Sequence, residues 1–259
     1  MVQIKSPDEI ERIFEAGRIV AEVLDELGRM IEPGVTTAEL DRAAESLILR
    51  RKAKPAFKGY RGYPATICAS INAEVVHGIP SPRRRLKDGD LVGIDLGALL
   101  GGWYGDAARS YLVGRRAGTA ERLSRATREA LERAVAVMVP GNRLGDIGNA
   151  VQSRVEPEGF SVVRQFVGHG IGRELHEDPQ VPNYGRPGRG LRLQEGMVLA
   201  VEPMINEGVC DVEVLDDGWT VVTADGKLSA HWEHTVAITA SGPRILTEGA
   251  AGGLEGEGQ

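Results

Sequence analysis

Residues 91–113 read LVGIDLGALLGGWYGDAARSYLV, and the pair Gly101-Gly102 divides this stretch into two apolar runs. Two glycines between extended apolar runs are typical of a two-residue β-hairpin turn. With the glycines at the turn, the register pairs Leu100 with Trp103, Gly97 with Asp106, and Asp95 with Ala108. Because side chains alternate along a strand, we expect the two acids to lie on one sheet face as diagonal neighbours.

Asp95 and Asp106 would therefore share an apolar face, where two carboxylates repel each other. One of them should hold a proton unless a cation lies between them, and a bound metal pair removes the conflict. The alternative is a pair of acids exposed at a sheet edge. The apolar residues 91–94 lead directly into Asp95 and favour burial.

A helix pair is predicted before the hairpin. Ser6 can cap the first helix, Pro7 suits its first turn, and Glu9 completes a capping box. Apolar residues then recur at helical spacing until Pro33-Gly34, which ends the helix. Thr37 can cap the second helix of the pair.

The same order returns after the hairpin. A helical stretch at 119–139 ends at Pro140-Gly141, a second helix is predicted at 146–156, and an extended segment at 160–167 follows. This recurrence fits either an internal duplication or coincidence, because amphipathic helices are common.

Further strands are predicted at 197–205, 219–222 and 231–239. No linker rich in Gly, Pro and Ser divides the chain. We therefore expect one α/β (α+β) domain over 1–248, with an antiparallel sheet inside and two helix pairs outside. The Gly- and Glu-rich segment 249–259 is predicted to be a disordered tail.

Composition excludes several classes of function. The net charge of −6 gives no attraction to nucleic acid or anionic membrane, and no apolar run approaches the roughly 20 residues that a membrane helix needs. Cys68 and Cys210 form no disulfide framework, and the N-terminus has no secretory apolar core. A cytoplasmic protein is expected.

Three further candidate ligands lie in apolar surroundings. His169 lies in the glycine-rich stretch 168–176, where the spacing does not match a dinucleotide fingerprint; taken alone, it fits a core histidine better. Glu202 follows an apolar run and precedes Pro203, which places it at a strand end. Glu233, taken alone, could also form a salt bridge with an arginine.

The five residues gain weight together. Asp95, Asp106, His169, Glu202 and Glu233 supply four carboxylates and one imidazole. Such a set suits a pair of divalent ions such as Mn, Fe, Co or Zn better than a structural tetrahedral zinc. The sequence therefore predicts two divalent metal ions, without their identity.

At this point the chain resembles the type I methionine aminopeptidases of the pita-bread metallopeptidase class, over about residues 6–246. The motifs that carry the resemblance are Ser70-Ile71-Asn72, His77-Gly78-Ile79-Pro80, Ile94-Asp95, Gly105-Asp106, Gly168-His169-Gly170-Ile171-Gly172-Arg173 with His176, Glu202-Pro203, Ser229-Ala230 and Glu233-His234. The resemblance implies a pseudo-twofold antiparallel sheet flanked by two helix pairs. Only 25 residues separate His176 from Glu202, which favours type I over type II.

The resemblance also implies roles. Asp106 and Glu233 are expected to bridge both metals, Asp95 to chelate one, and His169 and Glu202 to bind the other. Glu202 is also the expected proton shuttle. His77 and His176 match the histidines that contact the scissile peptide and stabilise the tetrahedral intermediate.

The resemblance maps the methionine pocket onto Tyr60, Tyr63, Cys68 and Trp219, groups that suit a thioether. The residues alone favour plain loop packing for the two tyrosines. The sequence departs from the family at three places, which leave the metal ligands intact but leave the substrate preference undetermined. Leu175 replaces a frequent Phe, Phe57 replaces a Cys found in some relatives, and His231-Trp232 replaces a more usual polar–aromatic pair, which could reshape the pocket wall or rim.

The expected function is a dimetal aminopeptidase that removes the initiator methionine from nascent chains and peptides, with a small second residue preferred. The alternatives are an X-Pro aminopeptidase or dipeptidase, a class that usually has an extra N-terminal domain, and a non-catalytic pita-bread binding module, which typically loses ligands. The expected partner is a peptide or nascent-chain N-terminus. A monomer is expected, and transient ribosome contact fits this role; nucleic acid and membrane are not expected.

Overall fold

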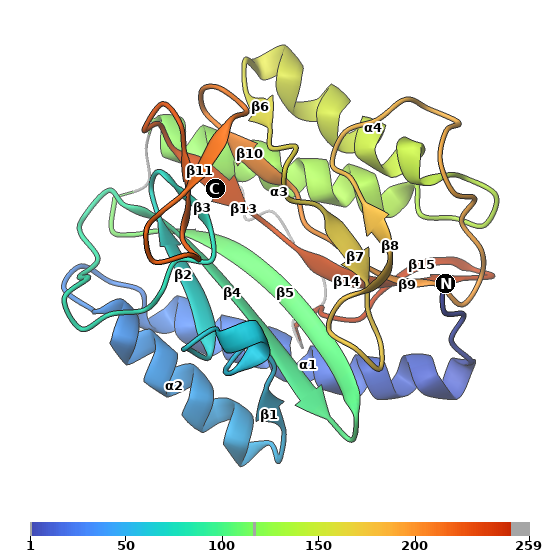
Figure 1. Cartoon of the computed structure of the whole chain (residues 1–259), viewed down its shortest axis with the longest axis horizontal. Helices are drawn as coiled ribbons and strands as arrows, with labels where there is room; N and C mark the ends of the chain where they lie inside the picture. The colour runs from blue at the N-terminus through green and yellow to red at the C-terminus, as the bar shows by residue number, and fades with distance from the viewer. Residues whose placement is uncertain (1, 116–117, 250–259) are drawn as a thin grey trace, which may run out of the picture.

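The predicted hairpin crosses the middle of the molecule in the computed structural model, which describes residues 2–115 and 118–249 (Figure 1). Strand β4 (Leu91–Leu100) and strand β5 (Trp103–Leu112) pair with Leu100 opposite Trp103 and Asp95 opposite Ala108. Both turn glycines have positive φ, 57° and 84°, which a two-residue turn of this kind requires. The predicted register is confirmed.

The first helix pair packs on this hairpin. Helix α1 (Pro7–Met30) begins with the predicted Ser6–Glu9 capping box, and helix α2 (Thr37–Arg50) follows. The N-cap of α2 is Thr36, so the prediction of Thr37 was wrong by one residue, because Glu39 closes a capping box with Thr36.

Glycine allows a close approach between α1 and β5. A Cβ on Gly105 would lie 2.6 Å from the backbone nitrogen of Gly17 in α1. The helix therefore touches the strand backbone one residue before Asp106, which fixes that part of the hairpin against the helix layer.

The edge of β4 opposite β5 carries β1 (Lys54–Pro55) and β2 (Ile67–Ile71), and Cys68 lies directly opposite Asp95. The short 3-10 helix η1 (Tyr60–Gly62) lies between β1 and β2.

The second helix pair comprises α3 (Thr119–Ala136) and α4 (Leu144–Val155), and the 3-10 helix η2 (Glu156–Glu158) follows. The largest sheet of this half has the order β15-β14-β9-β7-β8. Its strands are β7 (Gly168–Gly170), β8 (Glu177–Val181), β9 (Val198–Val201), β14 (His234–Thr239) and β15 (Gly242–Ile245).

Two small sheets complete the described structure. One has the order β13-β10-β6 and contains β6 (Ser161–Val162), β10 (Met204–Asn206) and β13 (Ser229–His231). The other has the order β11-β12-β3 and contains β3 (Glu74–Val76), β11 (Val212–Val214) and β12 (Val221–Thr223).

The strand predictions need three corrections. The segment 160–167 forms only the two-residue β6, the segment 197–205 breaks between β9 and β10, and the segment 231–239 breaks between β13 and β14. Pro203 explains the second break, because it cannot donate to a ladder. The predicted inner sheet is thus four small sheets, although every pairing among the described strands is antiparallel.

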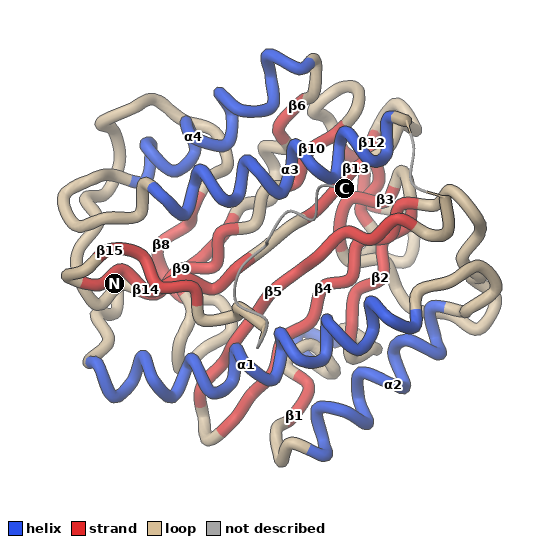
Figure 2. The backbone as a smooth tube through the Cα atoms, turned by 180° about the vertical axis from the view of Figure 1, so that it is seen from behind, coloured by secondary structure: helices blue, strands red, loops and turns tan. Residues whose placement is uncertain are grey.

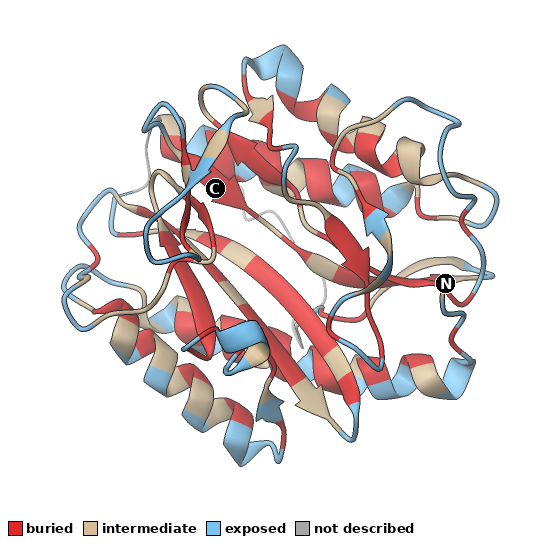
Figure 3. Ribbon diagram, viewed as in Figure 1, coloured by how far each residue is buried: buried red, intermediate tan, exposed pale blue. Residues whose placement is uncertain are grey.

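Both helix pairs cover the same face of these sheets, in front of the strands in Figure 2. The pair α1–α2 packs on β2, β4 and β5, while α3 and α4 pack on β9, β10, β13 and β14, in two separate apolar clusters. Figure 3 shows the buried residues concentrated in the central strands and on the inner sides of the helices. The repeated order of helix pair and strands is therefore also a repeat in space.

Within the described ranges, every helix is too short or too polar to cross a membrane. Residues 250–259 of the predicted tail lie outside the described residues.

Candidate metal centre

Backbone hydrogen bonds bring Glu233 to the hairpin acids. Glu233 lies between β13 and β14, and its N–H donates to the carbonyl oxygen of Ala108 at 2.9 Å, the residue opposite Asp95. The hydroxyl of Thr235 donates to the carbonyl of Asp106 at 2.7 Å and accepts from its N–H at 3.2 Å. The C-terminal half is thereby joined to β5 at Asp106 and at Ala108, the residue opposite Asp95.

The sheet of the C-terminal half places His169 beside Glu202. His169 on β7 pairs with Ala200 on β9, and Glu202 follows two residues later. The Nε2 atom of His169 lies 3.6 Å from Oε1 of Glu202. The side-chain amide of Asn183 donates to the carbonyl of Glu202 at 2.9 Å and holds this strand end.

A second hydrogen bond settles the tautomer of His169. Its Nδ1 lies 2.9 Å from the carbonyl oxygen of Gly170, which can only accept. Nδ1 therefore carries the hydrogen, and the lone pair of Nε2 is free. A backbone acceptor behind the ring is the usual support of a metal-binding histidine.

The acidic side chains converge on one point. Asp106, His169 and Glu233 are buried, and one donor atom from each lies within 4.8 Å of the others. Asp95 Oδ1, Asp106 Oδ1 and Glu233 Oε1 are buried and have no hydrogen-bond partner in the part of the chain that the structure describes. Among the residues described, no lysine or arginine forms an ion pair with any of the four carboxylates. Unpaired buried oxygens around a bare imidazole nitrogen fit a divalent cation.

The pKa values of the four carboxyl groups show that burial and mutual repulsion disfavour their ionised forms. Burial raises the pKa of Asp106 to about 7. Burial, together with the neighbouring Asp106, raises the pKa values of Asp95, Glu202 and Glu233 well above their usual range. Without a bound cation, the buried carboxyl groups are stable only while some of them are protonated. With a cation bound, all four can ionise.

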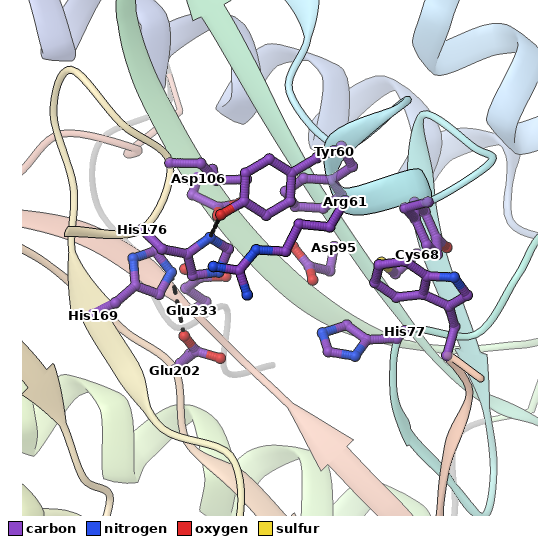
Figure 4. A pocket seen from close by; sticks show the side chains of 14 residues that line it. Tyr60, Arg61, Cys68, His77, Asp95, Asp106, His169, His176, Glu202 and Glu233 are labelled. Carbon is purple, nitrogen blue, oxygen red and sulfur yellow. Dashed lines mark hydrogen bonds and ion pairs between the residues drawn. The ribbon is translucent and has the colours of Figure 1, made fainter. Parts of the chain in front are cut away.

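One pocket of about 160 Å³ contains every predicted site residue (Figure 4). Its walls are Phe57, Tyr60, Arg61, Tyr63, Cys68, His77, Asp95, Asp106, His169, Leu175, His176, Glu202, Trp219 and Glu233. The acids occupy one part, and an apolar part contains Cys68 and the edge-to-face pair of Tyr63 and Trp219, whose ring centres are 5.1 Å apart. A ligand in this pocket would thus meet the acidic cluster and an apolar, polarisable wall together.

Two histidines border the acids without joining the closest group. Burial, helped by His169 and Arg61, lowers the pKa of His176 to about 3, and burial also lowers the pKa of His77. Both rings are therefore neutral N–H donors at pH 7. The Tyr60 ring stacks on His176 at 5.2 Å, and its hydroxyl lies 2.9 Å from Nδ1. If the hydroxyl donates, Nε2 of His176 carries the hydrogen.

His231 and Trp232 do not reshape the pocket wall or rim. His231 is buried behind Glu202, with its Nε2 3.9 Å from Oε2 of that residue, and Trp232 donates to the hydroxyl of Ser124 on α3. Alternation along one continuous strand would place His231 and Glu233 on the same face, but the strand is interrupted between them, because β13 ends at His231 and β14 begins at His234. Phe57 and Leu175 do line the pocket.

Arg61 and the pair of Lys5 and Glu177 were not predicted from the sequence. Lys5 and Glu177 form a buried ion pair at 2.5 Å. A lysine just before a helix cap gave no signal, but Glu177 directly follows His176, and an acid beside a candidate histidine is a usable one. The Oε1 atom of Glu177 also accepts from the backbone N–H groups of Arg173 and Glu174.

Comparisons with known proteins show the family to which this chain belongs. Residues 11–240 match metallopeptidase family M24. The chain belongs to this family, and its arrangement of helices and antiparallel sheets is the pita-bread fold. The methionine aminopeptidase of Clostridium perfringens is 54% identical over 247 residues, which make up 95% of this chain and 99% of that relative.

Solved structures extend the comparison. The methionine aminopeptidase of Thermotoga maritima has a TM-score of 0.94 at 50% identity, covering 96% of this chain and 100% of that chain. The prolidase of Pyrococcus furiosus has a TM-score of 0.75 at 27% identity, and the match covers 95% of this chain but 65% of that chain. The likeness is thus greater, and more complete, for the aminopeptidase.

Proposed function

We propose that this chain is a methionine aminopeptidase, which hydrolyses the initiator methionine from nascent proteins and peptides that have a small second residue. The observation that carries the proposal is the single pocket in which an acidic cluster adjoins an apolar wall with aromatic rings and a thiol. An unbranched thioether suits such a wall. The identity to methionine aminopeptidases over nearly the whole chain supports the same activity.

The proposed cofactor is a pair of divalent ions chosen from Co, Mn, Fe and Zn. Asp106 and Glu233 would bridge both ions, Asp95 would hold one, and His169 and Glu202 the other. When bound, the ions would supply an activated water and polarise the scissile carbonyl. The unpaired oxygens and the free Nε2 of His169 support this assignment.

The chain's own groups divide the remaining work. Glu202 is proposed to take a proton from the activated water and return it to the leaving amine, the role that the resemblance to the family implies for it. His77 and His176 would donate N–H bonds to the peptide carbonyl. Tyr60, Tyr63, Cys68 and Trp219 would bind the methionine side chain. Loop packing also applies to Tyr63, whose hydroxyl donates to main-chain carbonyls.

The remaining assignments are also proposals. Residues 1–248 are proposed to act as one catalytic unit. The enzyme is proposed to be a cytoplasmic monomer that contacts the ribosome transiently.

Substrate choice tests the proposed function. With metal supplied, methionine release from Met-Ala-Ser is expected to exceed release from Met-Lys-Ser by at least about 100-fold, because a small second residue is required and binding in a crowded subsite discriminates steeply. Free methionine measured by chromatography gives both rates. Ala-Pro-Ala serves as the control substrate. Faster cleavage of Ala-Pro-Ala would support the X-Pro alternative, and no cleavage of any peptide would support the non-catalytic one.

The buried ion pair beside His176 gives a second expectation. Lys5→Met is expected to lower kcat/KM roughly 10- to 100-fold, because the turn that presents His176 loses one anchor and small misplacements are costly. The control, Arg244→Gln, breaks an exposed pair with Glu11 and should change kcat/KM less than twofold.

A double-mutant cycle separates positioning from general damage. In a His176→Ala background, Lys5→Met should have almost no further effect, since the group it positions is gone. If Lys5→Met costs the same factor in both backgrounds, Lys5 does not act through His176. Lys5→Arg should restore most of the rate.

A further inference from the structure

The pocket mouth carries the positively charged side chain of Arg61, which has no role in the proposed reaction. Of the side chains that line the pocket, only Arg61 and His176 are exposed, so these two mark its opening. In Figure 4 the Arg61 side chain extends from the loop before β2 across the pocket toward His176. When the first side chain of a peptide lies against the apolar wall, the rest of the peptide has to leave the pocket past this guanidinium.

Arg61 occupies a backbone conformation that disfavours arginine. Its φ is 48° and its ψ 24°, in the left-handed region, although glycines stand close by on both sides. Hydrogen bonds from the N–H of Gly62 to Gly59 and from the N–H of Tyr63 to Tyr60 hold the turn in this shape. A side chain kept at a strained position in a pocket wall is a mark of function.

The charge of Arg61 is free to bind a ligand. Within residues 2–115 and 118–249, no carboxylate lies at ion-pair distance from it, and its guanidinium rests 5.4 Å from the centre of the Tyr60 ring. The hydroxyl of Tyr60 lies in turn beside His176, which is expected to contact the reacting carbonyl. The guanidinium of Arg61 is therefore held next to that carbonyl. Two divalent ions would balance the four carboxylates beneath and leave Arg61 as the positive charge at the mouth.

We propose that Arg61 is a specificity-determining residue that favours peptides with a carboxylate just beyond the scissile bond. A guanidinium binds carboxylates through paired N–H donors and repels ammonium groups. This inference rests on the proposed function and names its preferred substrate class. The carboxylate can be an acidic side chain or the free C-terminus of a short peptide.

A peptide series tests the proposal on the metal-loaded enzyme. The substrates are the C-terminal amides Met-Ala-Glu, Met-Ala-Gln and Met-Ala-Lys, with Met-Ala-Gln as the free acid to separate a terminal carboxylate from a side chain. The expected kcat/KM order is Glu above Gln above Lys, with steps of about 2- to 5-fold, the range for a partly exposed ion pair. The steps should shrink in 1 M salt.

Variants assign the effect to Arg61. Arg61→Gln should remove the preference and Arg61→Glu should reverse it, while Arg61→Gly relieves the backbone strain and should also remove it. Arg83→Gln, an exposed arginine outside the pocket, should keep it. Equal rates for Glu and Gln, or a preference that survives Arg61→Gln, would overturn the inference. Methionine release from Met-Ala-Gln amide without a charge preference would leave the proposed function intact; no release from any peptide would contradict that function first.

Discussion

Asp106→Ala is expected to reduce methionine release by more than about 10³-fold. Loss of a residue that only supports a metal ligand typically costs 10- to 100-fold, and a ligand shared by both ions should cost more. Asp106 is buried, its Oδ1 has no hydrogen-bond partner among the described residues, and its main chain is fixed by Thr235. The measurement is kcat/KM on Met-Ala-Ser with metal content determined in parallel.

Matched variants exclude loss of folding as the cause. Asp106→Asn keeps the shape but removes the charge, and should be as inactive as Asp106→Ala. Because burial raises the pKa of Asp106 to about 7, the Asn variant should also stabilise the metal-free protein above neutral pH, by up to about 4 kcal/mol. Asp25→Asn alters a carboxylate that already pairs with Arg109, and should keep near-normal rate. Near-normal turnover by either Asp106 variant would rule out the proposed metal centre.

Removal of metal is expected to lower the melting temperature of the wild-type protein by about 5–10 °C. An ion at 100 times its dissociation constant stabilises the folded state by about 2.7 kcal/mol, and 1 kcal/mol corresponds to about 2–4 °C for a chain of this size. Thermal melts with a chelator, and again after Mn²⁺ or Co²⁺ is restored, give this difference. Asp106→Asn is the control, because it should respond much less to the ion.

The pH dependence of this difference has a defined sign. Carboxyl groups whose folded pKa is raised stabilise the fold while protonated, and this contribution is lost as pH rises through the folded pKa. Burial raises the pKa of Asp106 to about 7 and those of Asp95, Glu202 and Glu233 well above normal. The metal-free protein should therefore still lose stability as pH rises above about 6.5 and through the folded pKa of Asp106, because the unfolded carboxyls are already ionised there.

The histidines act in the opposite direction below this window. Burial lowers the pKa values of His169 and His231, so the fold gains stability as pH rises toward the unfolded value of about 6.5. Above that pH only the carboxyls remain to titrate. The gain in melting temperature on adding metal should then be larger at pH 8 than at pH 6.5, and a gain that shrinks with pH would contradict the assigned ligands.

The hairpin could be predicted because its information is local. A two-residue glycine turn fixes the register, and alternation then fixes the face on which Asp95 and Asp106 lie. The capping box at Ser6 is equally local. Glu233 and His169 came from apolar context and family resemblance, because their place depends on contacts such as that between Glu233 and Ala108, far apart in sequence.

Other features had no signal in the sequence. Strand β8 contains Pro179, and exposed polar residues recur along it, so its sequence does not predict a strand. The turn at Arg61 is held by main-chain hydrogen bonds, and an arginine gives no hint of a left-handed conformation. His231 looked like part of the pocket wall because it is two residues from Glu233, yet it packs behind Glu202. Tertiary packing decides the placement of β8 and of His231, whereas local main-chain hydrogen bonds decide the turn at Arg61.

The hydrogen bonds between Thr235 and Asp106 join the two halves of the molecule that share the site. Asp95 and Asp106 belong to the N-terminal half, whereas His169, Glu202 and Glu233 belong to the C-terminal half. A cation bound by these residues would link the two halves of the molecule. Neither half carries all five of these residues, so the site requires both halves.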